Sequence, residues 1–241
     1  RKIIWKNVIM KKNILFIGGS TGIGIETIKQ ICDKHNIYIA CRSNENLDGL
    51  NVNYIEFDAT KDEFPVDQIP EILDGFVYFP GTINLRPFRS LKIETFVEDL
   101  NINFLSLVRC LKSVIGNLKK SESSSIIFFS TVAVKIGMPF HTSVSASKGA
   151  IEGFAKSLSA EYAPNVRVNV IAPSLTDTPM ADRFLNNDLK REKVSEKHPL
   201  KRFGSATDLA NTAEFLLSNK SSWMTGQIVR VDGGMSTVNN S

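Results

Sequence analysis

The sequence has 241 residues, of which 42% are hydrophobic and 22% charged, with a formal net charge of +4 at pH 7. This ordinary globular composition suits one α/β domain with a full core and argues against a second domain. The positive charge is spread along the chain, and even its densest pairs, Lys11 with Lys12 and Lys119 with Lys120, form no basic stripe. We therefore expect no nucleic-acid partner.

Cysteine spacing and hydropathy predict the cellular environment. Cys32, Cys41 and Cys110 show neither paired nor metal-ligand spacing, which favours separate thiols, a reducing compartment and no bound metal. No apolar run approaches the roughly 20 residues that span a bilayer, and charge breaks the amino-terminal segment too early for a signal peptide. We expect a soluble, cytoplasmic protein with no membrane partner. Met10 looks like a natural start, so residues 1–9 are expected to lie outside the fold and residues 10–241 to form a single domain.

The first predicted strand leads into a glycine-rich turn. Residues 14–17 form an apolar run that ends in glycine, and apolar residues follow at helical spacing over 25–31. Glycine lets the backbone approach a phosphate, and the free N–H groups of a first helical turn favour an anion. The turn from Gly18 to Gly24 is interpreted as a nucleotide cradle, although glycine marks any tight turn.

The rest of the chain alternates short apolar runs with helical patterns. Strands are predicted at residues 37–41, 52–57, 75–79, 125–130, 166–172 and 227–231, and helices at 93–118, 143–162 and 209–217. Such alternation predicts an α/β fold with a doubly wound parallel sheet and helices on both faces. Ligands of such sheets lie beyond the carboxyl ends of the strands, where the polar segment 176–199 is expected to act as a flap.

Over about residues 13–234 the chain resembles the short-chain dehydrogenase/reductase family, which has a Rossmann-type fold. The family's glycine motif is present at residues 17–24, with Ile17 in place of its threonine. Residues 168–178 resemble the nicotinamide-side segment, with Ser174 in place of glycine, and residues 225–234 resemble the family's carboxyl-terminal segment. The resemblance implies a dinucleotide-binding and catalytic domain that interconverts a carbonyl and an alcohol.

The resemblance also implies the residues that contact the cofactor, with Asp58 at the adenine. They are Gly18, Ser20, Thr21, Gly22, Ile23, Gly24, Arg42, Ser43, Asp58, Ala59, Gly81, Lys148, Pro173, Thr176 and Thr178. A carboxylate ending the second strand would repel a 2′-phosphate, but here Cys41 is followed by Arg42 and Ser43. Because a guanidinium suits a phosphate, we predict NADP(H) over NAD(H), the alternative being that Arg42 is an incidental surface residue.

The catalytic residues that the resemblance implies are incomplete. The family pairs a tyrosine with a lysine four residues later, places a serine thirteen residues before the tyrosine, and uses a helix asparagine in a proton relay. The corresponding residues are Asn103, Thr131, Val144 and Lys148, so valine stands at the tyrosine position. A general acid placed at the reacting atoms raises the reaction rate about 10²- to 10⁴-fold, and the isopropyl group of valine cannot act as one. We therefore expect cofactor binding to be retained even if the reaction is slow.

Other groups are weighed as replacements for the phenol. His141 titrates in a suitable range but is more simply read as an ordinary loop histidine, and Tyr78 is a weaker candidate that more simply packs in the core. Ser143 and Ser145 project about 100° away from position 144 on a helix. Ser130 is a less suited alternative to Thr131. His35 and His198 are expected at the surface.

Two functions therefore stay open. One is an NADP(H)-dependent oxidoreductase with impaired or altered proton donation, acting on an unidentified small molecule. The other is a catalytically inactive NADP(H)-binding sensor or partner subunit on the same fold. Family members often pair through the helices equivalent to 93–118 and 143–162, which implies a homodimer or homotetramer. The apolar residues of these helices would equally pack within one subunit: Phe104, Leu107, Ile151, Phe154 and Leu158.

Overall fold

The structure, a computed structural model, describes residues 11–239, so the predicted extension at residues 1–9 lies outside the described part. Its main sheet has 7 strands in the order β3-β2-β1-β4-β5-β6-β9, all paired in parallel. These strands are β1 (Asn13–Ile17), β2 (Asn36–Cys41), β3 (Val52–Glu56), β4 (Gly75–Tyr78), β5 (Ser124–Phe129), β6 (Val166–Pro173) and β9 (Ile228–Val231). A small second sheet pairs β7 (Thr176–Asp177) with β8 (Gly204–Ser205).

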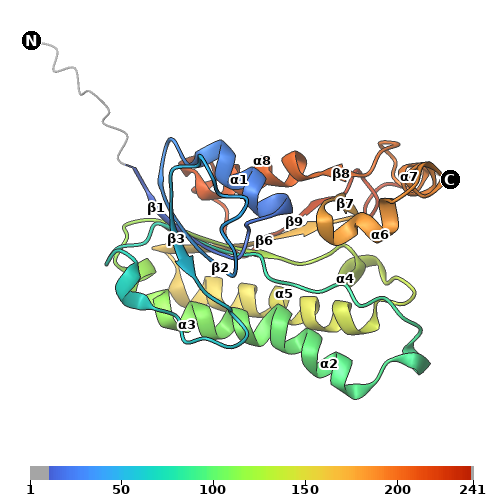
Figure 1. Cartoon of the computed structure of the whole chain (residues 1–241), viewed down its shortest axis with the longest axis horizontal. Helices are drawn as coiled ribbons and strands as arrows, with labels where there is room; N and C mark the ends of the chain where they lie inside the picture. The colour runs from blue at the N-terminus through green and yellow to red at the C-terminus, as the bar shows by residue number, and fades with distance from the viewer. Residues whose placement is uncertain (1–10, 240–241) are drawn as a thin grey trace, which may run out of the picture.

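Helices cover both faces of the sheet, as the alternation of patterns predicts (Figure 1). One face carries α1 (Gly22–Ile31) and α8 (Ala206–Leu217), and the other carries α3 (Ser106–Lys119) and α5 (Thr142–Tyr162). The remaining helices are α2 (Ile93–Leu100), α4 (Ala133–Ile136), α6 (Asp182–Leu185) and α7 (Asp188–Glu196). The single doubly wound α/β domain is therefore confirmed.

Helix boundaries differ from the predicted ones at three places. Helix α1 begins at Gly22, inside the glycine turn, and α8 begins at Ala206 behind a capping box formed by Ser205 and Asp208. The helix predicted over 93–118 is interrupted by a π-helical turn, Asn101–Leu105, that joins α2 to α3. Such a turn inserts one extra residue and is frequent at functional sites.

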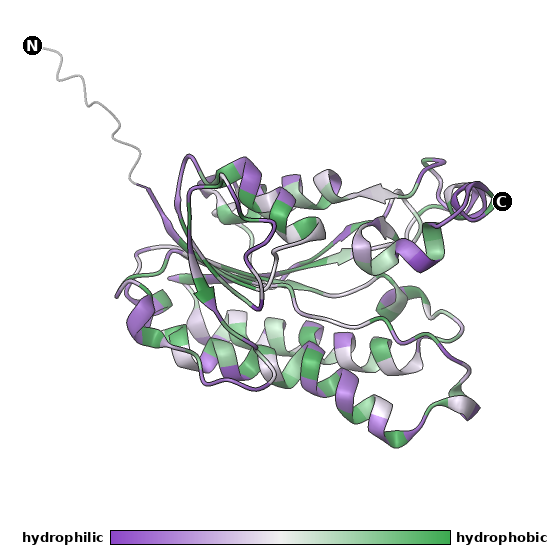
Figure 2. Cartoon of the chain, in the orientation of Figure 1, coloured by the Kyte–Doolittle hydropathy of each residue, from purple (hydrophilic) through white to green (hydrophobic). Residues whose placement is uncertain are grey.

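The central strands β1, β4, β5 and β6 are buried on both sides, which explains their continuous apolar runs. Leu15 and Ile17 of β1 point into the core cluster beneath α3 and α5, whereas Ile14 and Phe16 point into the cluster beneath α1 and α8. Figure 2 shows the matching pattern on the helices, whose hydrophobic residues face the sheet. None of the helices within residues 11–239 combines the length and hydropathy that crossing a membrane requires.

The chain order places a switch point between β1 and β4. The chain runs outward from β1 through β2 to β3, returns to β4 on the other side of β1, and continues through β5 and β6. The connections that follow β1 and β4 therefore diverge to opposite faces of the sheet, which opens a crevice at their carboxyl ends. The glycine turn after β1 and Gly81 after β4 both lie at this crevice.

A buried arginine ties the start of β6 to the end of α8. Arg167 is 5% exposed, and its guanidinium donates hydrogen bonds to the carbonyls of Leu216 (3.1 Å) and Ser218 (3.3 Å). It also donates to the carbonyl of Ser221 (3.0 Å). Carbonyls at a helix end lack partners within the helix, so Arg167 caps α8 from the neighbouring strand.

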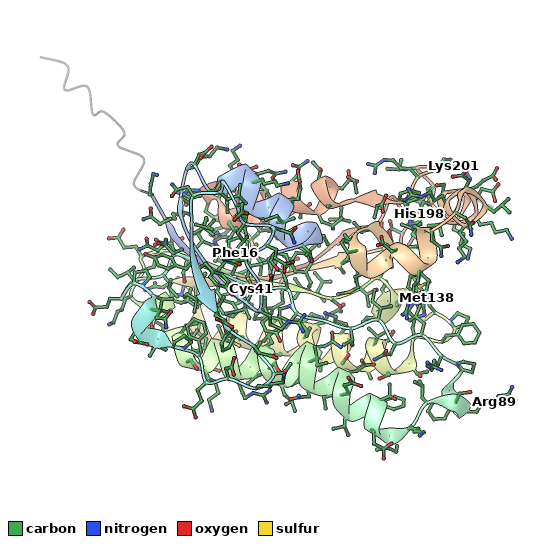
Figure 3. All side chains as sticks on the ribbon, in the orientation of Figure 1. Phe16, Cys41, Arg89, Met138, His198 and Lys201 are labelled. Atoms are coloured by element: carbon green, nitrogen blue, oxygen red, sulfur yellow. The ribbon has the colours of Figure 1, made fainter. Side chains whose placement is uncertain are left out.

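We expect Arg167→Met to lower the free energy of unfolding by about 2–4 kcal/mol, because it removes the hydrogen bonds that a buried guanidinium donates to three carbonyls. Urea denaturation measures the change. The matched control is Arg89→Met, at an exposed arginine (Figure 3) that makes no side-chain hydrogen bond within residues 11–239 and should change stability by less than about 0.5 kcal/mol. Equal effects of the two substitutions would contradict the capping role.

Candidate active site

The glycine turn after β1 brings strand and helix into direct backbone contact. Gly18 has a φ of +69°, a conformation that L side chains rarely adopt. A Cβ added to Gly24 would lie 2.2 Å from the Cα of Gly19, a separation that no side chain tolerates. The local chain can therefore close only with glycine at these positions.

The amino terminus of α1 is open to an anion. Thr21 occupies the N-cap position but its side chain makes no capping hydrogen bond, and the first turn carries no acidic residue. The first N–H groups of the helix are thus left to a ligand, and the helix dipole adds positive potential there. Glycine backbone and free donors together fit the pyrophosphate of a dinucleotide.

A cavity of about 1320 Å³ runs along the carboxyl ends of the strands beneath the segment that joins β7 to β8. All the predicted cofactor residues line it, and so do the predicted catalytic residues apart from Asn103. They are Gly18, Ser20, Thr21, Gly22, Ile23, Gly24, Arg42, Ser43, Asp58, Ala59, Gly81, Thr131, Val144, Lys148, Pro173, Thr176 and Thr178. Residues spread over most of the chain thus meet in one site.

The end of the cavity beyond β2 carries a cation beside a neutral thiol. Arg42 is exposed and forms no ion pair with any residue in 11–239. Burial raises the pKa of Cys41, whose thiol donates to the carbonyl of Ser43 at 3.3 Å. Asp58 is engaged by Thr60, and these hydrogen bonds lower the pKa of its carboxyl group.

Lys148 lies at the centre of the cavity and is held by the backbone. Its side chain is 8% exposed, and Nζ donates to the carbonyl of Phe129 at 3.0 Å. A Cβ at Gly81 would lie 3.2 Å from this Nζ and 3.0 Å from Oδ1 of Asn103. Glycine at position 81 therefore lets the loop after β4 pass directly over the lysine.

Asn103 lies behind the cavity wall, within the π-helical turn, and is fully buried. Its Oδ1 accepts the N–H of Thr82 at 3.1 Å, and its Nδ2 donates to Oγ of Ser147 at 3.1 Å. The side chain thus fixes the loop after β4 against α5. The role that the resemblance implies for Asn103, support of a water in a proton relay, stays a prediction.

A buried carboxylate completes this polar cluster and was missed by the sequence reasoning. Asp99 is fully buried and accepts hydrogen bonds from Ser143 Oγ (2.5 Å), from Asn84 Nδ2 (2.7 Å) and from the Thr82 hydroxyl. It stands four residues before Asn103, so the two polar side chains share one helix face. The spacing of four residues between Asp99 and Asn103 on a predicted helix was the sequence signal that could have predicted this polar cluster.

The environment of Lys148 shifts its titration. Burial lowers the pKa of Lys148 to about 8, against an opposing attraction from the carboxylate of Asp99. The ammonium is therefore easier to deprotonate than an exposed lysine.

The residues near position 144 can be sorted by their hydrogen bonds. Val144 is 4% exposed and lines the cavity one helical turn before Lys148. Ser130 donates its hydroxyl to Glu152 at 2.7 Å, whereas Thr131 Oγ1 accepts only a long bond of 3.3 Å from Ala133. Thr131 therefore has the more available hydroxyl.

The two candidate replacements for the phenol differ in position. Tyr78 is 2% exposed, belongs to the core cluster beneath α3 and α5, and donates to the carbonyl of Ile102 at 2.8 Å. Burial raises its pKa, so it is not a proton donor to the cavity. His141 does line the cavity, and its Nδ1 lies 2.7 Å from the carbonyl of Pro139. Because a carbonyl only accepts, Nδ1 carries the proton.

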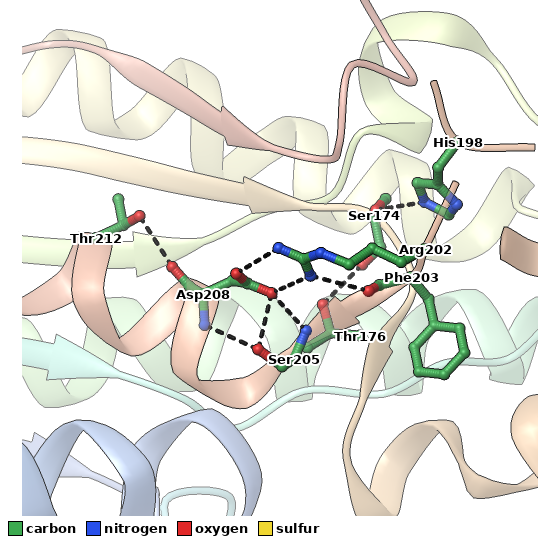
Figure 4. Close-up of polar contacts among 8 residues, drawn as sticks. All are labelled: Ser174, Thr176, His198, Arg202, Phe203, Ser205, Asp208 and Thr212. Carbon is green, nitrogen blue, oxygen red and sulfur yellow. Dashed lines mark hydrogen bonds and ion pairs between the residues drawn. The ribbon is translucent and has the colours of Figure 1, made fainter. Parts of the chain in front are cut away.

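The prediction that His198 lies at the surface is wrong. It is 2% exposed, with Nδ1 2.8 Å from the carbonyl of Val194 and Nε2 2.8 Å from Oγ of Ser174 (Figure 4). The serine that replaces the family's glycine thus holds the segment 178–203, which we call the flap. The sequence separates the two residues by 24 positions, so hydropathy could not predict their contact.

The base of the flap is fixed by further contacts. Strands β7 and β8 pair at its two ends, and Arg202 forms an ion pair with Asp208 of α8 at 2.6 Å (Figure 4). Arg191 of α7 pairs with Asp177 at 3.1 Å. The predicted flap is therefore an anchored cover of the cavity.

Comparisons with known proteins agree with this geometry. Residues 51–236 match the family model described as "Enoyl-(Acyl carrier protein) reductase". The chain is 31% identical to the 3-oxoacyl-[acyl-carrier-protein] reductase FabG of Chlamydia trachomatis over 95% of this chain and 98% of that protein. A short-chain dehydrogenase family protein of Francisella tularensis has a similar structure, with a TM-score of 0.87, 28% identity and coverage of 95% of this chain and 100% of that one. The structure of ElxO with NADP bound gives a TM-score of 0.86 at 23% identity, covering 95% of this chain and all of that one (100%).

The parallel sheet, the glycine turn and the cavity across the switch point define an oxidoreductase fold built for a nicotinamide dinucleotide. With the family model matching most of the chain, the protein belongs to the short-chain dehydrogenase/reductase family.

We expect the buried Lys148 to make stability depend on pH in the absence of ligand. Its pKa is about 8 in the folded protein and near the ordinary 10.5 when unfolded, so the unfolded chain binds the proton more tightly between these values. Stability should therefore rise from about pH 8 to about pH 10 by at most about 3 kcal/mol relative to Lys148→Met. Urea unfolding across this range measures it. Lys156→Met, at an exposed lysine of the same helix, should leave the pH profile unchanged.

Proposed function

We propose that the protein is an NADP(H)-dependent oxidoreductase that interconverts a carbonyl and an alcohol by an altered proton route. The observation that carries this proposal is the single cavity that joins the glycine turn, Arg42, Thr131 and Lys148. A nicotinamide dinucleotide bound there would supply or accept the hydride. The roles of the chain's own residues are to bind, to orient and to move the proton.

The preference for NADP(H) is supported by the charges at the end of β2. Arg42 stands free at the cavity, and the strand ends in a neutral thiol where a carboxylate would repel a 2′-phosphate. The family uses nicotinamide cofactors, and the related structure of ElxO holds NADP.

We expect Arg42→Asp to shift the ratio of the dissociation constants of NADH and NADPH by about tenfold or more towards NADH. The aspartate removes the phosphate-binding cation and adds a repelling charge. Fluorescence titration of both reduced dinucleotides measures the ratio. An unchanged ratio would show that Arg42 does not contact the 2′-phosphate. If the unsubstituted protein bound neither dinucleotide, the proposed function would be overturned.

For the chemical step, we assign the substrate oxygen to the Thr131 hydroxyl and the cofactor ribose to Lys148. Val144 has no proton to give, which also favours a second candidate function, a sensor that binds NADP(H) without turnover. His141 lines the same cavity, and histidine is the side chain most often used for general acid–base catalysis, so it is the replacement donor we favour. Oxidation of NADPH in the presence of a panel of carbonyl compounds separates the two functions, since the sensor would bind without oxidation.

We expect Val144→Tyr to raise the rate of NADPH oxidation with a carbonyl substrate at least about tenfold, because a phenol one turn before Lys148 restores a placed acid. Val144→Phe is the matched control, since it adds the same ring without the hydroxyl. Equal rates for the two variants would show that the geometry around Thr131 and Lys148 is not that of a working site.

We also propose that the chain forms a homodimer or homotetramer. The sequence left open whether Leu107, Ile151 and Leu158 pack between subunits or within one, and all three belong to the core of one subunit. Helix α2 instead exposes Ile93 and Val97, which are 72% and 61% exposed and lie one turn apart. This apolar stripe supports association through α2.

A further inference from the structure

Helix α7 of the flap turns a row of lysines towards the cavity. Lys190, Lys193, Val194 and Lys197 line the cavity, and their spacing of three, four and seven residues places them on one helix face. Arg183, earlier in the flap, lines the same region. The cover of the cavity is therefore basic on its inner side.

The carboxylates of the flap lie elsewhere. Asp188, Glu192 and Glu196 of α7 do not line the cavity. Within residues 11–239, Lys193 and Lys197 make no side-chain hydrogen bond or ion pair, so their charge is uncompensated. Lys190 donates to the Arg183 carbonyl and to Asn186 Oδ1, two neutral groups that leave its charge in place.

This basic face is separate from the phosphate-binding residues proposed for the cofactor. Arg42 follows β2 and the flap follows β6, and four strand spacings of about 4.8 Å separate these strands, or about 19 Å. In Figure 3, Cys41 at the end of β2 lies near the middle of the molecule, whereas His198 of the flap lies near one end. The acidic side chains that line the cavity, Glu45 and Asp58, follow β2 and β3, away from α7.

The basic face lies on the substrate side of the cavity. His198 and Met138 both line the cavity, and they lie at the same end of the molecule (Figure 3). Met138 precedes α5, the helix that carries Val144 and Lys148, so α7 covers the end where the substrate would meet the reacting groups. The bond between His198 and Ser174 holds α7 in this position.

We propose that Lys190, Lys193 and Lys197 bind a phosphate or carboxylate group of the substrate, so that the site selects an anionic carbonyl compound or alcohol. The inference rests on the proposed function and adds the class of substrate to it. Ammonium groups on flexible stems act as point charges and adapt to either anion, and their field also steers charged ligands into the cavity.

The experiment uses pairs of ketones that differ in charge. Dihydroxyacetone phosphate is compared with dihydroxyacetone, and acetoacetate with its methyl ester, each titrated by calorimetry into protein saturated with NADP⁺. A ketone cannot be reduced by the oxidised cofactor, and the absence of NADPH fluorescence checks that the hydroxyl groups of the two dihydroxyacetones are not oxidised, so the readout is binding without turnover. We expect the anionic member of at least one pair to bind about tenfold more tightly than its neutral partner, and the responding pair distinguishes phosphate from carboxylate.

The double substitution Lys193→Gln with Lys197→Gln should reduce this preference about fivefold or more while leaving NADP⁺ binding unchanged. Lys201→Gln is the matched control, because Lys201 is exposed on the same flap but does not line the cavity (Figure 3). The preference should also fall as salt is raised, since the lysines are exposed.

Equal binding within both pairs, no binding of any of the four ketones, or the same loss in the Lys201→Gln variant would each overturn the inference. If NADP⁺ binds normally in these cases, the proposed function is retained and only the anion site formed by the lysines of α7 is rejected. If neither dinucleotide binds, the proposed function fails and this inference fails with it.

Discussion

The approach of helix α1 to the end of strand β1 is the constraint on which the site depends. Gly24 and Gly19 bring the two backbones so close that a single Cβ would lie 2.2 Å from the opposite Cα. This contact aims the first turn of α1, without a side-chain cap, at the crevice beside β4. The same contact leaves the helix dipole and the free N–H groups as the anchor for an anion, and the rest of the cavity is arranged around that anchor.

On the other side of the crevice, a network of polar side chains holds Lys148 in place without a phenol. Asp99 supplies the buried negative charge, Asn103 connects the loop after β4 to α5, and Gly81 lets that loop cross above the ammonium. These groups are satisfied by one another, so the network persists although Val144 contributes only packing. This arrangement explains how α5, which carries Lys148, is held against the loop after β4 with a valine at position 144.

The flap is fixed at its base and covers the cavity. Its base is fixed by the β7–β8 pair, by the Arg202–Asp208 ion pair and by the hydrogen bond between Ser174 and His198. Ser174 has a plain structural reason, since a glycine at that position would leave a ring nitrogen of a buried histidine without its partner. With its base fixed, helix α7 places its lysines, and not its carboxylates, along the cavity, on the face that we propose binds an anionic substrate.

The sequence by itself determined the fold class, the order of most elements, the glycine turn and the residues that meet in the cavity. The first three follow from local patterns, because hydrophobic period and glycine position act within a few residues of the chain, whereas the residues that meet in the cavity were implied by the resemblance to the family. Only the tertiary structure decided where the polar side chains lie. It places Asn103 behind the cavity, Tyr78 in the core and His198 in a buried position. It also surrounds the Asp99 carboxylate with hydrogen-bond donors and places the lysines of α7 along the cavity. Each of these depends on contacts between segments far apart in the sequence, such as Asp99 with Ser143, 44 positions away. Burial and partners of polar side chains are set by how the elements pack together, and hydropathy along the chain carries no record of that packing.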